Sequence, residues 1–167
     1  MKLGKTFLLF VILIITVGIV SAVDISNFKA PSNFESDGNC SFYELNELGI
    51  LDENGISIEV FTEENMKETQ ELIGSDEDTD KESFFKNDTS LNYTVENSDE
   101  ENIFFFSDCV NELKGYVELI KIGDDEIIIE SNVDFNASDD KIKQSLDVLK
   151  EFNKLNDFKL ISPNLND

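Results

Sequence analysis

The sequence predicts an α+β fold: a mainly antiparallel sheet with one long C-terminal helix and a shorter helix packed on one face. Strand-like segments follow one another without regular alternation of strand and helix, which favours antiparallel pairing. Two of them, residues 116–122 and 126–131, flank a Gly-Asp-Asp turn and give the strongest hairpin signal of the chain. A C-terminal segment then carries an apolar stripe at helical spacing, and such a stripe needs a sheet to cover it.

The first half of the folded region predicts two strands and a short helix. Residues 28–34 mark an extended segment, and a strand is expected over residues 41–45. After an Asn-Gly turn, residues 56–60 alternate apolar and polar side chains with the two-residue period of a half-buried strand. Thr62 is a helix N-cap followed by two glutamates, and Gly74 stands where the helix should stop. We expect a short, half-exposed helix between them.

A polar region over residues 75–101 is expected to be a solvated loop. Three of its aspartates repeat every second residue, as at the start of a calcium-binding loop: Asp76, Asp78 and Asp80. Lys81 occupies the sixth position, where that loop needs Gly, and Asn87 the twelfth, where it needs Glu. These aspartates are therefore weak metal candidates, and we expect no metal site and no cofactor.

The second half predicts further strands and the long helix. Residues 103–106 form a strand before the hairpin, and residues 158–161 form a short last strand. Either Asn136 or Ser138 caps the helix, whose apolar residues recur at spacings of three and four: Ile142, Leu146, Leu149, Phe152 and Leu155. No internal repeat and no Pro-rich or Gly-rich linker divides the chain, so residues 23–167 are expected to form one acidic domain.

The N-terminus has the pattern of an export signal. Lys2 and Lys5 precede an apolar run over residues 7–20, and small residues follow at the positions that a signal peptidase reads. We expect residues 1–22 to be a signal peptide that is cleaved after Ala22. The alternative is an uncleaved membrane anchor over residues 7–23, which reaches the lower end of the roughly 17 to 25 residues that a spanning helix needs. Either route places the domain outside the cytoplasm.

Cys40 and Cys109 are the two thiols of the chain. In an exported protein, an even number of cysteines predicts a disulfide, so we expect a bond between them. The alternative is two separate thiols that pack as small hydrophobic side chains.

Four Asn-x-Ser/Thr triplets are candidate glycosylation sites in an exported chain: Asn87, Asn92, Asn136 and Asn39. The first two are favoured because they lie in the most polar stretch. A sequence rich in Asn, Ser and Thr also produces such triplets by chance.

The negative charge of the chain argues against nucleic acids as partners. The chain has 36 Asp and Glu against 13 Lys, contains no Arg, and has a net charge of -23. Removing residues 1–22 takes away two Lys and no acid, which makes the remaining charge -25. A surface this negative repels the phosphate backbone of nucleic acids, which is bound through Lys and Arg. Cations, or a basic or cell-envelope partner, suit it better.

The sequence contains little catalytic machinery. Without His there is no Ser-His-Asp or Cys-His arrangement and no His-based zinc site. No phosphate-binding glycine loop occurs either. A pair of carboxylates acting on a glycoside needs no His, and with 36 acids some pair will always meet the required distance. We therefore expect a non-enzymatic protein, with a carboxylate-pair hydrolase as the alternative.

Five features of the chain occur together in one group of proteins. They are the export segment, the Phe-x-x-Pro-x-x-Phe pattern at 28–34, the sequence FFKND at 84–88, the hairpin strands at 116–120 and 127–130, and the ending LKEFNKLN at 149–156. In these features the chain resembles small uncharacterised acidic secreted proteins of methanogenic archaea. The resemblance implies an extracytoplasmic location and a reducing habitat that disfavours the disulfide. It implies no activity and no functional residue.

Together these observations predict an exported, non-enzymatic domain that acts by binding, at the cell surface or as a secreted protein. The ligand or partner is not specified by any motif.

Overall fold

The computed structural model describes residues 23–66 and 81–163. The expected cleavage position after Ala22 and the three aspartates Asp76, Asp78 and Asp80 lie outside these residues. Within the two ranges, no helix is long and apolar enough to cross a membrane.

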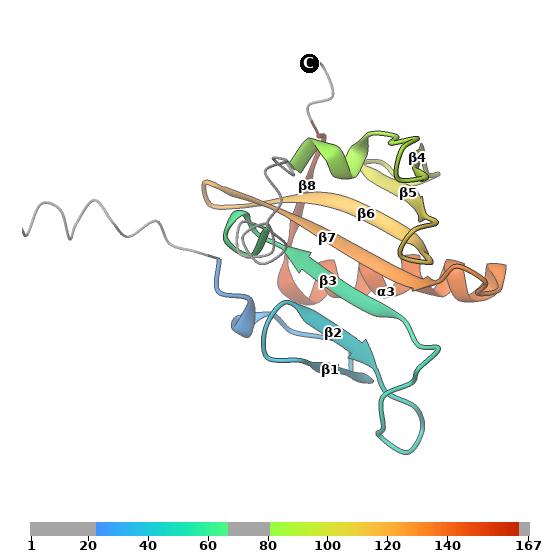
Figure 1. Ribbon diagram of the computed structural model, residues 1–167. Helices are drawn as coiled ribbons and strands as arrows, with labels where there is room; N and C mark the ends of the chain where they lie inside the picture. The colour runs from blue at the N-terminus through green and yellow to red at the C-terminus, as the bar shows by residue number, and fades with distance from the viewer. Residues whose placement is uncertain (1–22, 67–80, 164–167) are drawn as a thin grey trace, which may run out of the picture.

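Eight strands form one antiparallel sheet in the order β1-β2-β3-β7-β6-β5-β4 (Figure 1). The eighth strand, β8, pairs with the part of β6 that extends beyond β5. The bounds are β1 (Phe34–Ser36), β2 (Ser41–Glu44), β3 (Ser57–Phe61), β4 (Tyr93–Asn97), β5 (Ile103–Asp108), β6 (Leu113–Ile122), β7 (Asp125–Asp134) and β8 (Lys159–Ile161). Two 3-10 helices, η1 (Ile25–Asn27) and η2 (Lys81–Phe85), and one long helix, α3 (Asp139–Asn156), complete the elements that lie wholly within the described residues. The predicted α+β fold with a mainly antiparallel sheet is confirmed.

The hairpin of β6 and β7 lies at the centre of the sheet, and its two strands pair over ten residues each. Gly123 in the connecting turn has a φ angle of +63°, a conformation that glycine adopts without strain. Gly115 allows a close backbone approach, because a Cβ atom there would lie 2.0 Å from the carbonyl oxygen of Ser131. The predicted hairpin is therefore confirmed, and both of its strands are longer than predicted.

Helix α3 packs on β6 and β7 and lies behind the sheet in Figure 1. The hydroxyl of Ser138 accepts a hydrogen bond from the backbone N–H of Lys141 at 3.3 Å, so Ser138, and not Asn136, is the N-cap. The helix buries Leu149 and Phe152 against apolar residues of the sheet, which include Ile58, Val60, Ile120, Ile127 and Ile129. This α3 face holds the larger part of the core.

The opposite face, here called the front face, carries a second apolar cluster of Met66, Phe85, Phe106, Val117, Leu119 and Ile128. The shorter helix begins after Thr62, whose hydroxyl accepts from the backbone N–H of Asn65 at 3.2 Å, as predicted for an N-cap. Its residues 63–66 are described, and Met66 packs in the front-face cluster and not in the α3-side core. The expectation that both helices share one face is therefore not confirmed.

Part of the region expected to be a solvated loop is strand β4, which lies at one edge of the sheet and pairs with β5. Tyr93 and Val95 pack against the front-face cluster, whereas Thr94 and Glu96 are exposed. The alternation is short and is surrounded by polar residues, which is why the composition of residues 75–101 predicted a loop.

A buried acid links α3 to the central hairpin. The side-chain amide of Asn153 on α3 donates a hydrogen bond of 2.9 Å to Oε2 of Glu118 on β6. Burial raises the pKa of Glu118 from 4.5 to about 8, and the bond from Asn153 offsets only part of this. The second carboxyl oxygen of Glu118, Oε1, and the side-chain carbonyl oxygen of Asn153, Oδ1, are both buried without a hydrogen-bond partner.

A proton on Glu118 would allow a hydrogen bond that involves both of these unpaired oxygens. A neutral carboxylic acid donates through its O–H and still accepts through its other oxygen, so protonated Glu118 can donate to the Asn153 carbonyl while it accepts from the amide. An ionised Glu118 would leave both of these buried acceptors without a donor, and each unsatisfied group costs about 1 to 3 kcal/mol. We infer that Glu118 is protonated in the folded protein at neutral pH.

Replacing Glu118 by Gln should therefore stabilise the protein at alkaline pH. The pKa of Glu118 is higher in the folded protein than in the unfolded chain. The stability that protonated Glu118 contributes is therefore fully present below pH 4.5 and is lost as the pH rises through about 8. The amide of Glu118→Gln donates to Asn153 without needing a proton. The gain in unfolding free energy is expected to be small at pH 5 and to reach at most about 5 kcal/mol at pH 9.

Thermal and denaturant melts between pH 5 and pH 9 measure this effect. Glu96→Gln on the exposed side of β4 is the matched control, because it removes the same charge without a buried partner. An equal gain in both variants would show that the effect is only a reduction of net charge.

Candidate functional site

The front face carries a pair of acids at its centre. Glu59 on β3 and Glu130 on β7 are direct partners in the antiparallel pairing, and both point away from α3. Only 7% of Glu130 is exposed. The pKa of Glu130 is raised to about 8, chiefly by burial and also by repulsion from Glu59 and Asp108, while Asn132 acts to lower it. The pKa of Glu59 is raised mainly by burial. The pair therefore holds a proton at neutral pH, mainly on Glu130.

Asn132 lies beside this pair and has an unused donor. Its side-chain oxygen accepts a hydrogen bond from the hydroxyl of Ser57 on the neighbouring strand. Its amide nitrogen lowers the pKa values of both Glu59 and Glu130, yet makes no hydrogen bond of good geometry. Asn132 is only 1% exposed, so its side-chain N–H donor is shielded from bulk water.

Tyr93 connects the acid pair to the neighbouring surface. Its ring stacks on Phe106 with 5.9 Å between centroids, and its hydroxyl donates to the backbone carbonyl of Phe84 at 3.0 Å. Burial raises the pKa of Tyr93, and the nearby Glu130 and Asp108 raise it further. The phenol therefore stays neutral, and the field around it is negative.

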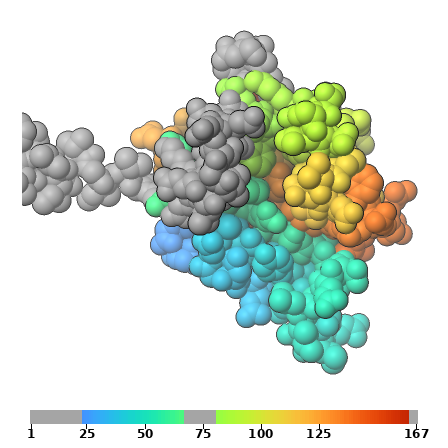
Figure 2. Space-filling view, in the orientation of Figure 1, coloured from blue at the N-terminus to red at the C-terminus, as the bar shows by residue number. Residues whose placement is uncertain are grey.

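On the outer side of Tyr93 lies a pocket of about 260 Å³, lined by Ser83, Phe84, Asp88, Leu91, Tyr93, Asp108, Val110 and Asn111. These residues come from η2, from the loop before β4, from the first residue of β4, and from the end of β5 with the turn that follows it. Leu91 and Val110 are 55% and 60% exposed. Figure 2 looks onto the front face, where these segments, lime to yellow, lie at the upper right.

Two aspartates hold the loops of the pocket in place. Oδ1 of Asp88 accepts hydrogen bonds from the backbone and hydroxyl of Ser90, at 2.8 and 2.6 Å, and these bonds lower the pKa of Asp88. Oδ1 of Asp108 accepts from the backbone N–H groups of Val110 and Asn111, at 2.9 and 3.0 Å. Each aspartate thus fixes a tight turn while its charge stays beside the pocket.

A second, more open hollow of about 550 Å³ lies near the end of α3. Phe28, Leu155 and Phe158 contribute apolar surface, and Lys121 and Lys159, which are direct partners on β6 and β8, also line it. Because the front-face pocket is bordered by stable strands and short turns, we take it as the candidate functional site.

The predicted disulfide is not formed, since Cys40 and Cys109 are both free. Cys40 directly precedes β2 and Cys109 directly follows β5, and three strands lie between β2 and β5. At about 4.8 Å per strand spacing, the two strands are roughly 19 Å apart. A disulfide requires Cα atoms within about 7 Å. This separation could not be predicted, because the order of strands in a sheet is not visible in a sequence.

The four candidate glycosylation sites, Asn39, Asn87, Asn92 and Asn136, are all exposed. Asn92 follows Leu91 in the loop that borders the pocket and has a φ angle of +51°. The side chain of Asn87 accepts from the backbone N–H of Val95 at 2.6 Å, so it also orders the approach to β4.

Sequence reasoning did not single out the residues of the front face. The sequence predicts Glu59 as a polar position of an alternating strand and Glu130 only as part of a hairpin strand, and the lining of the pocket falls mostly in the region expected to be a loop. Glu130 offered one signal, since it directly follows three consecutive isoleucines. Across residues 23–66 and 81–163, no group of three or more Cys, Asp or Glu side chains is placed to hold a metal ion.

Comparison of the chain with protein-family models, with curated proteins and with solved structures finds no match.

Replacing Glu59 by Gln should lower the pKa of Glu130. The negative charge of Glu59 is one cause of the raised value, and a neutral amide removes that repulsion while it keeps the shape of the side chain. Carboxyl carbon NMR titration of Glu130 in both proteins measures the shift. Glu35→Gln on β1, an exposed position, is the control. An unchanged Glu130 titration in Glu59→Gln would mean that burial alone sets its pKa.

Proposed function

We propose that this protein is exported and acts outside the cytoplasm as a binding domain, not as an enzyme. The observation that carries the proposal is the front-face pocket, which has apolar walls and is formed by loops fixed to a stable sheet. The N-terminal export pattern and the lack of His support the location and the absence of common catalytic groups. The resemblance to secreted archaeal proteins agrees with this location. The four exposed Asn-x-Ser/Thr triplets then remain candidate glycosylation sites.

The pocket has the properties of a site for a small molecule. Its volume of about 260 Å³ lies just below the range of about 300 to 1,000 Å³ that is usual for ligand sites. Phe84, Leu91, Tyr93 and Val110 provide an apolar surface, and a few polar side chains stand among them. Such a combination binds a compact ligand by burying its apolar part and orienting its polar part.

A hydrolase that uses two carboxylates is the second candidate, and it rests on Glu59 and Glu130. They face each other on neighbouring strands, and one of them keeps its proton near neutral pH, as an acid catalyst must. However, Glu130 is almost fully buried and neither acid lines either of the pockets described above. Hydrolysis of simple glycosides that is abolished by Glu130→Gln would favour this candidate over binding.

Binding in the pocket can be tested with benzyl alcohol, a small neutral aromatic probe. We expect it to shift the backbone amide signals of Leu91 and Val110 in NMR spectra at millimolar concentration, because the apolar walls receive the ring. Val110→Trp should abolish these shifts, since the larger side chain fills the mouth of the pocket.

Leu48→Trp is the matched control, because Leu48 is 82% exposed and lies in the loop between β2 and β3. It should leave the shifts unchanged. Absence of shifts in the parent protein, or equal shifts in both variants, would contradict binding at this pocket.

Export with cleavage predicts that the native protein begins at Val23. Small residues at the cleavage site direct the signal peptidase to the bond after Ala22. Mass measurement of the protein from its native source decides the question. An intact Met1 in the membrane fraction would select the anchor instead.

A further inference from the structure

We propose that the front-face pocket binds a small organic cation: a primary ammonium group attached to a short apolar chain or ring. This inference rests on the proposed binding function and specifies the class of ligand.

The apolar part of such a ligand has a defined place. Leu91 and Val110 are exposed at the mouth, although side chains of this size are normally buried when nothing covers them. Phe84 and Tyr93 form the inner walls. A ligand chain that lies between these four side chains removes their apolar surface from water, which is favourable by about 25 cal/mol per Å².

The charged part follows from the acids of the lining. Asp88 and Asp108 both line the pocket, and none of its eight lining residues is basic. The hydrogen bonds that Asp88 accepts keep its pKa low, so it is ionised at neutral pH. Both Oδ1 atoms are used by the turns, and Oδ2 of Asp88 is the acceptor that the turn leaves available to a ligand.

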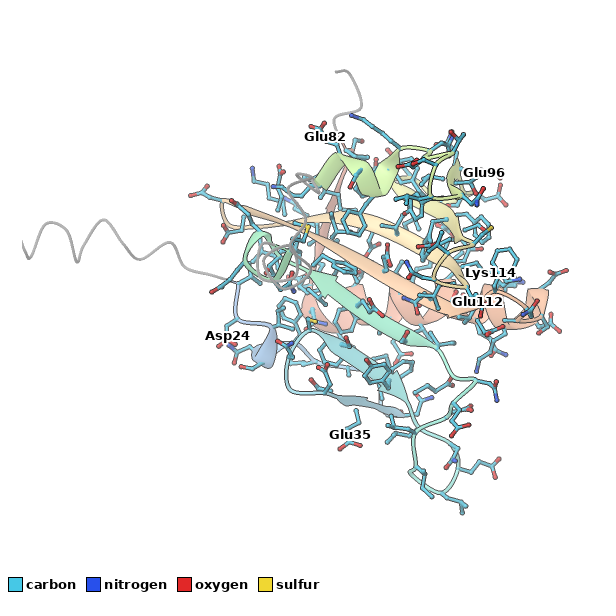
Figure 3. The ribbon with its side chains drawn as sticks, in the orientation of Figure 1. Asp24, Glu35, Glu82, Glu96, Glu112 and Lys114 are labelled. Atoms are coloured by element: carbon cyan, nitrogen blue, oxygen red, sulfur yellow. The ribbon has the colours of Figure 1, made fainter. Side chains whose placement is uncertain are left out.

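The surroundings of the pocket are also negative. Figure 3 shows Glu82, Glu96 and Glu112 on the upper and right-hand side of the molecule, where the pocket loops lie. The lysines of this region are engaged elsewhere. Lys86 pairs with Glu82 at 3.2 Å, and the ammonium group of Lys114 lies over the ring of Phe135 at 5.8 Å.

Two aromatic rings in the wall add to the preference for a cation. Ammonium groups are attracted to the faces of Phe and Tyr rings by about 0.5 to 1 kcal/mol at exposed sites. The hydroxyl of Tyr93 gives its hydrogen to the carbonyl of Phe84, so its oxygen can act only as an acceptor toward a ligand. An anionic ligand would find no positive partner in the lining and would be repelled by the same carboxylates.

The test uses three probes of equal chain length that differ in charge: hexylammonium, hexan-1-ol and hexanoate. Their affinities are measured by NMR titration of the purified protein at pH 7 and 0.15 M NaCl. Two exposed ion pairs and one ring contact together give hexylammonium an expected advantage of about tenfold over hexanol. Hexanoate should bind most weakly.

Asp108→Asn and Asp88→Asn each remove one charge and keep the Oδ1 that accepts from the backbone of the turn; Asp108→Asn also removes the bond of 2.8 Å that Oδ2 accepts from the side chain of Asn111. Each should weaken hexylammonium binding about two- to fivefold and leave hexanol binding unchanged. Asp134→Asn and Asp52→Asn are matched controls. They remove the same charge from aspartates that accept from the backbone N–H two residues on, at 2.7 and 3.1 Å, and that do not line the pocket.

The outcomes separate the two proposals. Equal binding of hexylammonium and hexanol would overturn the cation preference and leave the binding function standing. Equal losses in the pocket variants and the controls would also overturn it, because only the net charge would then matter. If none of the probes shifts the amides of Leu91 and Val110, both the cation site and the proposed function at this pocket are contradicted.

Discussion

The central hairpin must be buried on both of its faces, and the rest of the structure depends on this constraint. Residues 127–133 of β7 are all buried, because α3 covers one side and the front-face cluster covers the other. Every polar side chain within this buried stretch therefore needs a partner in the protein, and an acid there is favoured in its neutral form. Ser131 meets the requirement by donating to the backbone carbonyl of Ser145 on α3 at 2.8 Å. The two glutamates meet it by keeping a proton.

The two glutamates lie on opposite faces of the hairpin, Glu118 toward α3 and Glu130 toward the front. Burial raises the pKa of each to about 8, so the protonated form of each predominates at pH 7. Both acids are therefore neutral in the stable fold near pH 7, and the real charge of the folded protein is less negative than its composition implies. The acids lie in different surroundings: Glu118 joins helix to sheet, whereas Glu130 faces Glu59 on the front face.

The sequence predicted the elements whose signals are local. The alternation around Ile58, the Gly-Asp-Asp turn and the stripe through Leu149 are each carried by neighbouring residues, and each element was found. It did not predict which strands adjoin, so the distance between Cys40 and Cys109 was unknown. The pocket was missed for the same reason, since Tyr93 on β4 and Val110 in the turn after β5 are brought together only by the pairing of these strands. The face on which the shorter helix packs depends on contacts of the same long-range kind.

The two outer strands of the sheet, β1 and β4, each pair on one side only. Such strands offer free backbone groups to other molecules, and proteins guard them by keeping them short or charged. Here β1 has three residues and includes the exposed Glu35, while β4 carries the exposed Glu96. At neutral pH, repulsion between the negatively charged molecules further protects these edge strands from pairing with one another. Acidification weakens that repulsion, and it also favours the neutral form of the buried glutamates. The acidic conditions that make a single molecule hardest to unfold are therefore also those in which the sheets of neighbouring molecules can join edge to edge.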